Sequence, residues 1–227
     1  MNEPLVLANG ICRSFPNGRN ASLPALIDID CHVDAGDRAA LVGVSGSGKT
    51  TLLHILGGLD APTSGSISWP ALGARDELLL GKVAFVFQAP SLFPALTVVQ
   101  NVALPLLLMD KQVDATARAR EILAKFELLD LSEKLPEELS GGQAQRVAMA
   151  RALVTGARLI LADEPTGQLD SSTATNLLDL VLDIIDDTDT ALVIATHDET
   201  VAARLNRRWS IDAGQLRNDA KPARKSA

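Results

Sequence analysis

Tyrosine is absent from this sequence, and aromatic residues of any kind make up only 3% of its 227 positions. Apolar residues still make up 47% of the chain, so a sizeable core is possible and must be mostly aliphatic. The length fits one compact domain better than two. No apolar run reaches the roughly 18 residues that are needed to span a bilayer. If the protein acts at a membrane, another chain must supply the span.

Signals for export and for disulfide formation are also missing. The N-terminus, MNEPLVLANG, has no positively charged start followed by an apolar core, so we expect no export signal. Cys12 and Cys31 show no CxxC or Cys/His spacing, which favours two free thiols in a reducing cytosol over a metal site.

An excess of basic residues is missing as well. The chain holds 28 acidic and 21 basic residues, and this net charge of -7 argues against a nucleic-acid partner, which requires a clustered basic face. Basic residues do gather near the C-terminus, and two interpretations stay open: a solvated, frayed tail over 218–227, or contact with a membrane surface or an acidic partner. They are Arg204, Arg207, Arg208, Arg217, Lys221, Arg224 and Lys225.

Apolar patterning predicts strands and helices that alternate along most of the chain. We expect strands over 5–12, 25–33, 39–42, 83–87, 159–162 and 191–195, with a short strand around residue 67. We expect helices over 49–56, 97–109, 114–129 and 172–185, and helix starts near 140 and after 198. Turns are expected at 15–18 and 62–65. This order indicates a parallel α/β core with a mostly helical insert over about 89–156.

The segment Gly43–Thr50, GVSGSGKT, matches the phosphate-loop pattern GxxxxGK[ST] in full, between an expected strand and an expected helix. Its glycines let successive N–H groups point at a triphosphate, and the helix N-terminus adds partial positive charge. Lys49 would reach the β and γ phosphates, and the hydroxyl of Thr50 would bind Mg²⁺. A glycine-rich turn is the simpler alternative, and small-molecule kinases, GTPases and motor ATPases share the loop. The expected nucleotide-binding residues are Gly43, Ser45, Gly46, Ser47, Gly48, Lys49, Thr50 and Thr51.

Two adjacent carboxylates, Asp163 and Glu164, follow the expected strand over 159–162. In phosphate-loop enzymes an acid at this place holds Mg²⁺, directly or through water, and we assign that role to Asp163. Neighbouring side chains at a strand end diverge, so Glu164 would instead orient and deprotonate the attacking water. A pair of solvated acids at the end of a strand is the alternative interpretation.

A second anion-binding helix start is expected at Ser140, which is a natural N-cap. Gly141 and Gly142 follow it and leave the backbone amides of the helix N-terminus open. A capped helix start after a glycine turn is the simpler interpretation, but capping alone does not require both glycines.

Together with Leu139 and Gln143, these residues spell LSGGQ, and the chain therefore resembles the ABC ATPase family, whose signature this is. The resemblance covers the chain from about residue 5 to residue 216. It implies four further functional positions: the adenine-stacking aromatic, the Q-loop glutamine, the D-loop and the switch histidine. They correspond here to Phe15, Gln88, Asp170 and His197. Tyrosine is commoner at the first of these positions, and a buried core phenylalanine stays an alternative there.

The resemblance also implies a fold. We expect an α/β P-loop NTPase (RecA-like) core with an N-terminal antiparallel β-subdomain and an inserted α-helical subdomain. Within a single domain over 1–227, the β-subdomain and core would take 1–88 and 157–217. The helical subdomain would take 89–156, and 218–227 would be a flexible tail.

A mechanism that needs two copies of the chain is implied as well. Each ATP would lie between the P-loop of one subunit and the segment Ser140–Gln143 of the other, and hydrolysis would release the pair. The implied catalytic residues are Lys49, Glu164 and His197, and the implied Mg²⁺ ligands are Thr50, Gln88 and Asp163.

Segments 56–65 and 101–106 resemble a bacterial subgroup that includes macrolide exporters, lipoprotein-releasing complexes, antimicrobial-peptide exporters and haem exporters. This implies an ATPase at the cytoplasmic face of the membrane that powers a separate permease and receives a permease helix around 92–107. Otherwise that surface is a plain amphipathic helix packed in its own domain. An amino-acid importer ATPase is the runner-up. A soluble P-loop ATPase outside transport and a P-loop kinase are the alternatives from other classes, and LSGGQ argues against the kinase.

Overall fold

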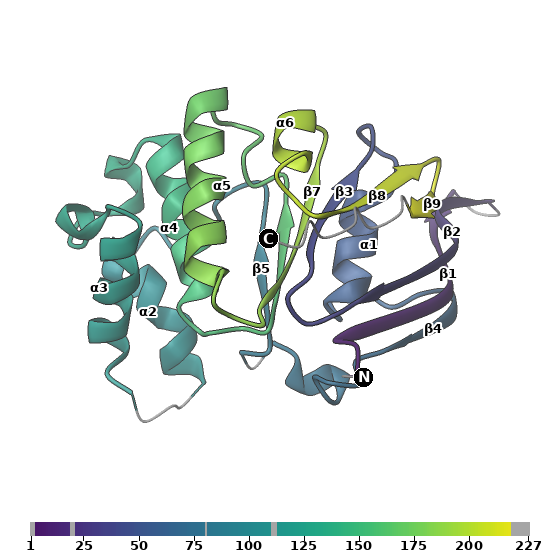
Figure 1. The fold of residues 1–227 in the computed structure, drawn as a ribbon, viewed down its shortest axis with the longest axis horizontal. Coiled ribbons are helices and arrows are strands. Elements are labelled where there is room, and N and C mark those ends of the chain that lie inside the picture. Colours follow the sequence, from purple (N-terminus) through teal and green to yellow (C-terminus); the bar gives the residue numbers. More distant parts are fainter. Residues whose placement is uncertain (1–2, 19–20, 80, 110–112, 219–227) are drawn as a thin grey trace, which may run out of the picture.

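A computed structural model describes residues 3–18, 21–79, 81–109 and 113–218, and Figure 1 shows how they fold. Within these residues, a central sheet has the strand order β5-β6-β7-β3-β8-β9 and a smaller sheet has the order β2-β1-β4. The strands are β1 Val6–Asn17, β2 Ala21–Val33, β3 Arg38–Val42, β4 Ser64–Ser68, β5 Val83–Val86, β6 Leu159–Asp163, β7 Ala191–Thr196, β8 Arg207–Asp212 and β9 Gln215–Asn218. The α-helices are α1 Lys49–Leu56, α2 Val98–Leu108, α3 Ala115–Lys125, α4 Gly141–Leu153, α5 Ser171–Ile185 and α6 Glu199–Ala202, and the short 3-10 helices are η1 Arg75–Glu77, η2 Leu129–Leu131 and η3 Pro136–Glu138.

The central sheet is parallel from β5 to β8, and β9 pairs with β8 antiparallel. Its inner strands are buried on both faces, as continuous apolar runs predict. In β6, Leu159 and Leu161 join one core, and Ile160 and Ala162 join the other. Helix α1 and the smaller sheet cover the first core, whereas α2 to α5 cover the second (Figure 1). The expected fold class is therefore confirmed.

The starts of four long helices carry side-chain caps, and the start of α1 does not. A capping side chain satisfies backbone N–H groups that the helix itself leaves without partners. At α1 the N-cap is Gly48, with φ of 111° and no side-chain cap. The first amides of α1 therefore stay open toward the P-loop. The four caps are Thr97 for α2, Asp114 for α3, Ser140 for α4 and Asp170 for α5.

The turn that we expected at 15–18 is wrong in its placement, because β1 continues to Asn17. Phe15 pairs with Leu23 and Pro16 pairs with Ser22 on β2. The partner on the other side, β4, reaches only to Cys12. Beyond that point β1 has one free edge, where a proline interrupts no ladder.

Strands β8 and β9 were missed because charged residues hid the alternation of β8. In this strand Trp209 and Ile211 are buried, and Arg207 is also buried in an ion pair with Asp37, with 2.5 Å between Nη1 and Oδ2. Arg208 pairs with Glu199, and Arg204 pairs with Asp179. These three arginines are therefore held in ion pairs within the fold. Of the expected tail over 218–227, Asn218 ends β9 and the remainder, including Lys221, Arg224 and Lys225, lies outside the described residues.

The helix that we expected over 114–129 ends four residues early. Helix α3 stops at Lys125, and Glu127 has a positive φ of 56°, which no α-helix continues through. Leu129, the last residue of the expected helix, instead begins η2. None of the helices in the described ranges has the length and apolar character to cross a membrane.

Candidate functional site

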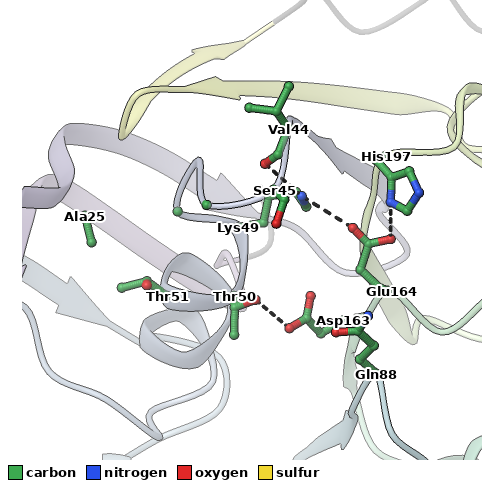
Figure 2. A pocket seen from close by; sticks show the side chains of 12 residues that line it. Ala25, Val44, Ser45, Lys49, Thr50, Thr51, Gln88, Asp163, Glu164 and His197 are labelled. Carbon is green, nitrogen blue, oxygen red and sulfur yellow. Dashed lines mark hydrogen bonds and ion pairs between the residues drawn. The ribbon is translucent and has the colours of Figure 1, made fainter. Parts of the chain in front are cut away.

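A cavity of about 550 Å³ opens where four parallel strands end and α1 begins (Figure 2). Ligands bind at this edge of open parallel sheets, because the loops that follow the strands diverge there. Loops after β3, β5, β6 and β7 all reach the cavity. The lining residues are Ala25, Val44, Ser45, Gly46, Gly48, Lys49, Thr50, Thr51, Gln88, Asp163, Glu164 and His197.

The P-loop approaches other backbone so closely that two of its positions have no room for a side chain. A Cβ at Gly43 would lie 2.3 Å from the carbonyl oxygen of Ile211. At Gly48, which has the positive φ noted above, a Cβ would lie 2.6 Å from the carbonyl oxygen of Ala25. Glycine at these positions is therefore required by contacts within the chain itself.

Lys49 is held in place by hydrogen bonds to the P-loop backbone. Its side chain is 7% exposed, and its Nζ donates to the carbonyl oxygens of Gly43, at 2.8 Å, and Val44, at 3.2 Å. The same atom lies 3.4 Å from Oε1 of Glu164. This ammonium group lines the same cavity as the P-loop backbone at the start of α1, an arrangement that suits an anion.

Glu164 lies between two candidate catalytic side chains, as Figure 2 shows. One oxygen faces Lys49, and the other lies 2.8 Å from Nδ1 of His197. The glutamate is 12% exposed, whereas the histidine is 67% exposed. Glu164 also has a positive φ of 48°, an uncommon conformation for this residue type. Strain of this kind clusters at functional sites, and here it aims the carboxylate into the cavity.

Oxygen atoms suited to Mg²⁺ meet on one side of the cavity. The hydroxyl of Thr50 donates to Oδ2 of Asp163 at 2.6 Å, and Gln88 lines the same wall. Mg²⁺ prefers such hard oxygen ligands, and it commonly takes one or two carboxylates together with substrate phosphates. One carboxylate, one hydroxyl and one side-chain amide fit that pattern.

A second concavity, of about 360 Å³, lies at the start of α4. It shares no lining residue with the first. Ser140 caps α4: its Oγ accepts from the N–H of Gln143 at 3.2 Å, and its own N–H donates to Oε1 of Gln143 at 2.9 Å. The lining residues are Ser140, Gly142, Gln143, Arg146, Gln168, Leu169, Asp170 and Thr173.

The glycines of this concavity have space around them. A Cβ at Gly141 would meet no atom within 4 Å, and one at Gly142 would come no closer than 3.5 Å to Leu169. Neither glycine has a positive φ. Nothing within the described chain therefore requires glycine here, in contrast to Gly43 and Gly48.

Asp170 brings the expected D-loop to this concavity. Its carboxylate caps α5 and accepts hydrogen bonds from the side chains of Ser172 and Thr173, each at 2.6 Å. These hydrogen bonds, first that from Ser172, hold the pKa of the Asp170 carboxyl well below its ordinary value. The residue is therefore ionised at the start of α5 across the physiological pH range.

Three predicted nucleotide-binding residues do not line the first cavity: Phe15, Gly43 and Ser47. Phe15 is 39% exposed, and the guanidinium carbon of Arg13 lies 4.5 Å from its ring centroid. Ser47 is 4% exposed, and its Oγ has no hydrogen-bond partner within the described chain. Phe15 is therefore a partly exposed aromatic, not the buried core residue of the alternative interpretation.

Sequence reasoning missed several lining residues, among them Ala25, Arg146 and Thr173. Ala25 lies on β2 and reaches the cavity through its close approach to Gly48, which joins segments far apart in the sequence. Arg146 follows the signature and Thr173 follows the D-loop, and their nearness in sequence to Gln143 and Asp170 was an available signal.

An apolar groove of about 480 Å³ lies between the central sheet and the helical insert. It overlaps the predicted docking surface at Phe93, Leu104 and Pro105, but it also extends to the end of β5. The apolar lining residues are Leu59, Leu79, Val83, Ala84, Phe85, Phe87, Phe93, Leu104, Pro105, Leu108, Met109 and Ala152, and the others are Gly81, Ser91, Arg151 and Thr155.

Comparisons with known proteins agree with this geometry. A family model described as ABC transporter matches residues 26–167. The lipoprotein-releasing system ATP-binding protein LolD of Chromohalobacter salexigens is 43% identical over 227 residues, which cover 96% of this chain and 95% of that protein. LolD of Bordetella pertussis is 44% identical over 224 residues, which cover 95% of this chain and 96% of that protein.

Solved structures with a similar fold include dimeric ones. The ATP-binding cassette MJ0796, as a dimer in a post-hydrolysis state bound to ADP and Pi, has a TM-score of 0.86 and 34% identity, with 95% of this chain and 98% of that chain covered. CbiO1 from Clostridium perfringens, part of the ABC transporter complex CbiONQ, has a TM-score of 0.83 and 25% identity, with 97% of this chain and 90% of that chain covered.

Proposed function

Because this chain belongs to the ABC transporter family as an ATP-hydrolysing subunit, we propose that it powers a separate membrane permease that releases lipoproteins. Its substrate is ATP, with Mg²⁺ as the usual cofactor. The cargo is inferred from relatives at 43% and 44% identity whose names describe lipoprotein release. We further propose that the chain works at the cytoplasmic face of the membrane, held there by the permease.

One observation carries the coupling to a partner. Phe87 lines the apolar groove, and the next residue, Gln88, lines the nucleotide cavity. A protein helix seated in the groove would therefore lie one residue away from the site of hydrolysis. The groove suits an apolar helix, because Phe93 and Leu108 are 53% and 74% exposed on its walls.

Within one subunit, the P-loop amides and Lys49 would hold the β and γ phosphates. Thr50, Gln88 and Asp163 would hold Mg²⁺, which when bound neutralises charge on the phosphate oxygens. Glu164 would take a proton from the attacking water, since its carboxylate lines the cavity between Lys49 and His197. His197, on the open side of Glu164, would contact the γ-phosphate.

We propose that a second copy completes each site. The signature concavity and the P-loop cavity are separate in one chain, so one subunit does not enclose a nucleotide with both. The open glycines at 141 and 142 support contact with a nucleotide that the other subunit holds. Asp170 lies in the same concavity and would meet the partner there. The dimeric state of the related cassette MJ0796 supports this arrangement.

The test is reconstitution of the chain in liposomes with the membrane protein encoded beside its gene. We expect the permease to stimulate ATP hydrolysis and ATP to drive release of a labelled lipoprotein from the liposomes. The Glu164→Gln variant should bind the same permease without releasing lipoprotein. Hydrolysis that does not respond to the permease, or a response to peptide, macrolide or haem instead of lipoprotein, would overturn the proposal.

A further inference from the structure

The Q-loop, taken here as residues 88–96, is fastened to the helical insert by two side chains. Arg151, near the end of α4, donates from Nη1 to the carbonyl oxygen of Ser91 at 2.9 Å and from Nη2 to that of Pro90 at 3.0 Å. Asn101 of α2, which is fully buried, holds Phe93 at both its N–H and its carbonyl oxygen, at 2.8 and 3.1 Å. Gln88 lies just before this fastened stretch and points into the nucleotide cavity.

From this geometry we propose that Arg151 is a positioning residue that sets where Gln88 stands in the Mg²⁺ site. The inference rests on the proposed role of Gln88 as a metal ligand. Arg151 itself does not line the nucleotide cavity. It acts through the backbone at 90 and 91, two and three residues beyond Gln88.

The contacts of Arg151 suit this task better than a surface role. Its planar guanidinium offers donors in a fixed fork, and the two acceptors are carbonyl groups of successive residues. Burial lowers the pKa of this guanidinium, and no acidic side chain in the described ranges forms an ion pair with it. A charged side chain held against an apolar groove is costly, and the two hydrogen bonds to the carbonyl oxygens offset part of that cost.

The backbone that Arg151 holds is in an uncommon conformation. Ser91 has a positive φ of 49°, and its hydroxyl donates to the carbonyl oxygen of Ala89 at 3.0 Å. A serine in the left-handed region persists only where its surroundings hold it there. Without the guanidinium, this turn would relax to other conformations and Gln88 would lose its fixed position. Ser140 caps the same helix that carries Arg151. The hydrogen bonds of Arg151 to the Q-loop therefore also link the signature to the proposed Mg²⁺ site.

The experiment uses the full chain with Mn²⁺ in place of Mg²⁺, since Mn²⁺ binding in the presence of ATP is measurable by EPR without turnover. The variants are Arg151→Gln, Arg151→Lys, Gln88→Ala and the double variant Arg151→Gln with Gln88→Ala. Arg158→Gln is the matched control, because Arg158 also donates to a carbonyl oxygen, that of Ala71 at 2.6 Å, and does not line the nucleotide cavity. ATP binding in EDTA and the unfolding temperature are recorded for every variant.

We expect Arg151→Gln to weaken Mn²⁺ binding about tenfold, as losses of groups behind a metal ligand do, with ATP binding in EDTA unchanged. Arg151→Lys should lose most of the same affinity, because an ammonium group does not span both carbonyls. The double variant should bind Mn²⁺ as Gln88→Ala does, since both changes act through one ligand. Arg158→Gln should behave as wild type.

Three outcomes decide the matter. If Gln88→Ala weakens Mn²⁺ binding but neither Arg151 variant does, the positioning role is wrong and the metal assignment stands. If the two losses multiply in the double variant, Arg151 acts by another route and the inference is overturned. If Gln88→Ala binds Mn²⁺ as wild type, the assignment of Gln88 falls and takes this inference with it. Should Arg151→Gln fail to fold, the Arg151→Lys variant carries the same comparison.

Discussion

Two helix starts in this molecule carry glycines and open amides, and they differ in what holds the glycines in place. At the start of α1, a side chain on Gly43 or Gly48 would collide with backbone of the same chain, at 2.3 and 2.6 Å. At the start of α4, a Cβ on Gly141 would meet nothing within 4 Å. Contacts within one subunit account for the first set of glycines, whereas no contact within the described residues accounts for the second.

The two sites also differ in their charged groups. Around α1, one cavity is lined by Lys49, Asp163 and Glu164. Lys49 contacts Glu164, and Asp163 accepts a hydrogen bond from the hydroxyl of Thr50. Around α4, Ser140 and Asp170 each cap a helix start and no lysine lines the concavity. Under the proposed function, the catalytic groups of hydrolysis lie in one subunit, and the signature contributes contacts to a site whose catalytic groups belong to the other.

The largest effect is expected from Glu164→Gln. Loss of a general base typically costs about 10²- to 10⁴-fold in rate, so ATP turnover should fall by about a thousandfold while ATP binding remains. Because the nucleotide is not consumed, dimers should accumulate with ATP in size-exclusion chromatography. Glu121→Gln, which changes an exposed glutamate paired with Arg118, is the control. If the Glu164→Gln variant stays monomeric at all ATP concentrations, the claim that the start of α4 contributes to a site in a second subunit is contradicted.

A hundredfold effect is expected from Gly141→Ala, and it should differ in kind from that of Gly48→Ala. The added methyl group at 141 would block the partner's nucleotide, and loss of a preorganised contact costs about 10²- to 10³-fold in rate. Its unfolding temperature should stay at or slightly above that of wild type, since alanine favours helix. Gly48→Ala should instead destabilise the fold by at least about 1–2 kcal/mol, because its φ is positive.

Thermal unfolding and ATPase assays on the two variants decide this directly. A Gly141→Ala protein that unfolds early, or that hydrolyses ATP as wild type does, would remove the distinction between the two helix starts.

A smaller effect is expected from Phe15→Ala. Stacking of a base on an aromatic ring is worth about 1–3 kcal/mol, so the Kd for ATP should rise about fivefold or more. Phe15→Tyr should bind as wild type does. Isothermal titration without Mg²⁺ measures both, and an unchanged Kd for Phe15→Ala would show that the adenine rests elsewhere and that the ring belongs with Arg13 alone.

The smallest effect concerns the pH dependence of stability. The depressed pKa of Asp170 means that its cap stabilises the folded chain above the unfolded pKa, near 3.9, and that this contribution is lost as pH falls toward the folded value. Asp170→Asn keeps a capping side chain but has no charge to lose. Its unfolding temperature should therefore fall less than that of wild type between pH 5 and pH 3. Parallel curves for the two proteins would contradict this origin of the acid sensitivity.

The parts of the site that the sequence predicted lie in contiguous segments. Residues of the P-loop and the acidic pair end strands that the apolar pattern identifies, and parallel strands bring their carboxyl ends to one edge. Lys49, Asp163 and His197 meet in one cavity for this reason. The family resemblance and the expectation of an ATPase are confirmed by the comparisons as well.

What the sequence did not predict depends on contacts between distant segments. Ala25 reaches the P-loop only because β2 passes beside Gly48, and no local pattern encodes that approach. The burial of Arg207 depends on Asp37, which lies 170 residues away in the chain. In the sequence, Arg151 looks like any other arginine on a predicted helix. Its hydrogen bonds to the carbonyl oxygens of residues 90 and 91 depend on the tertiary fold.

The most direct test of the central claim is a structure of the Glu164→Gln variant with ATP and Mg²⁺. We predict that the Ser140 hydroxyl and the amides beside it contact the γ-phosphate of an ATP whose other phosphates rest on the P-loop of the second subunit. If Ser140 and its two glycines instead stand away from every terminal phosphate in a dimer with ATP bound, the account of α4 as half of a shared site is contradicted.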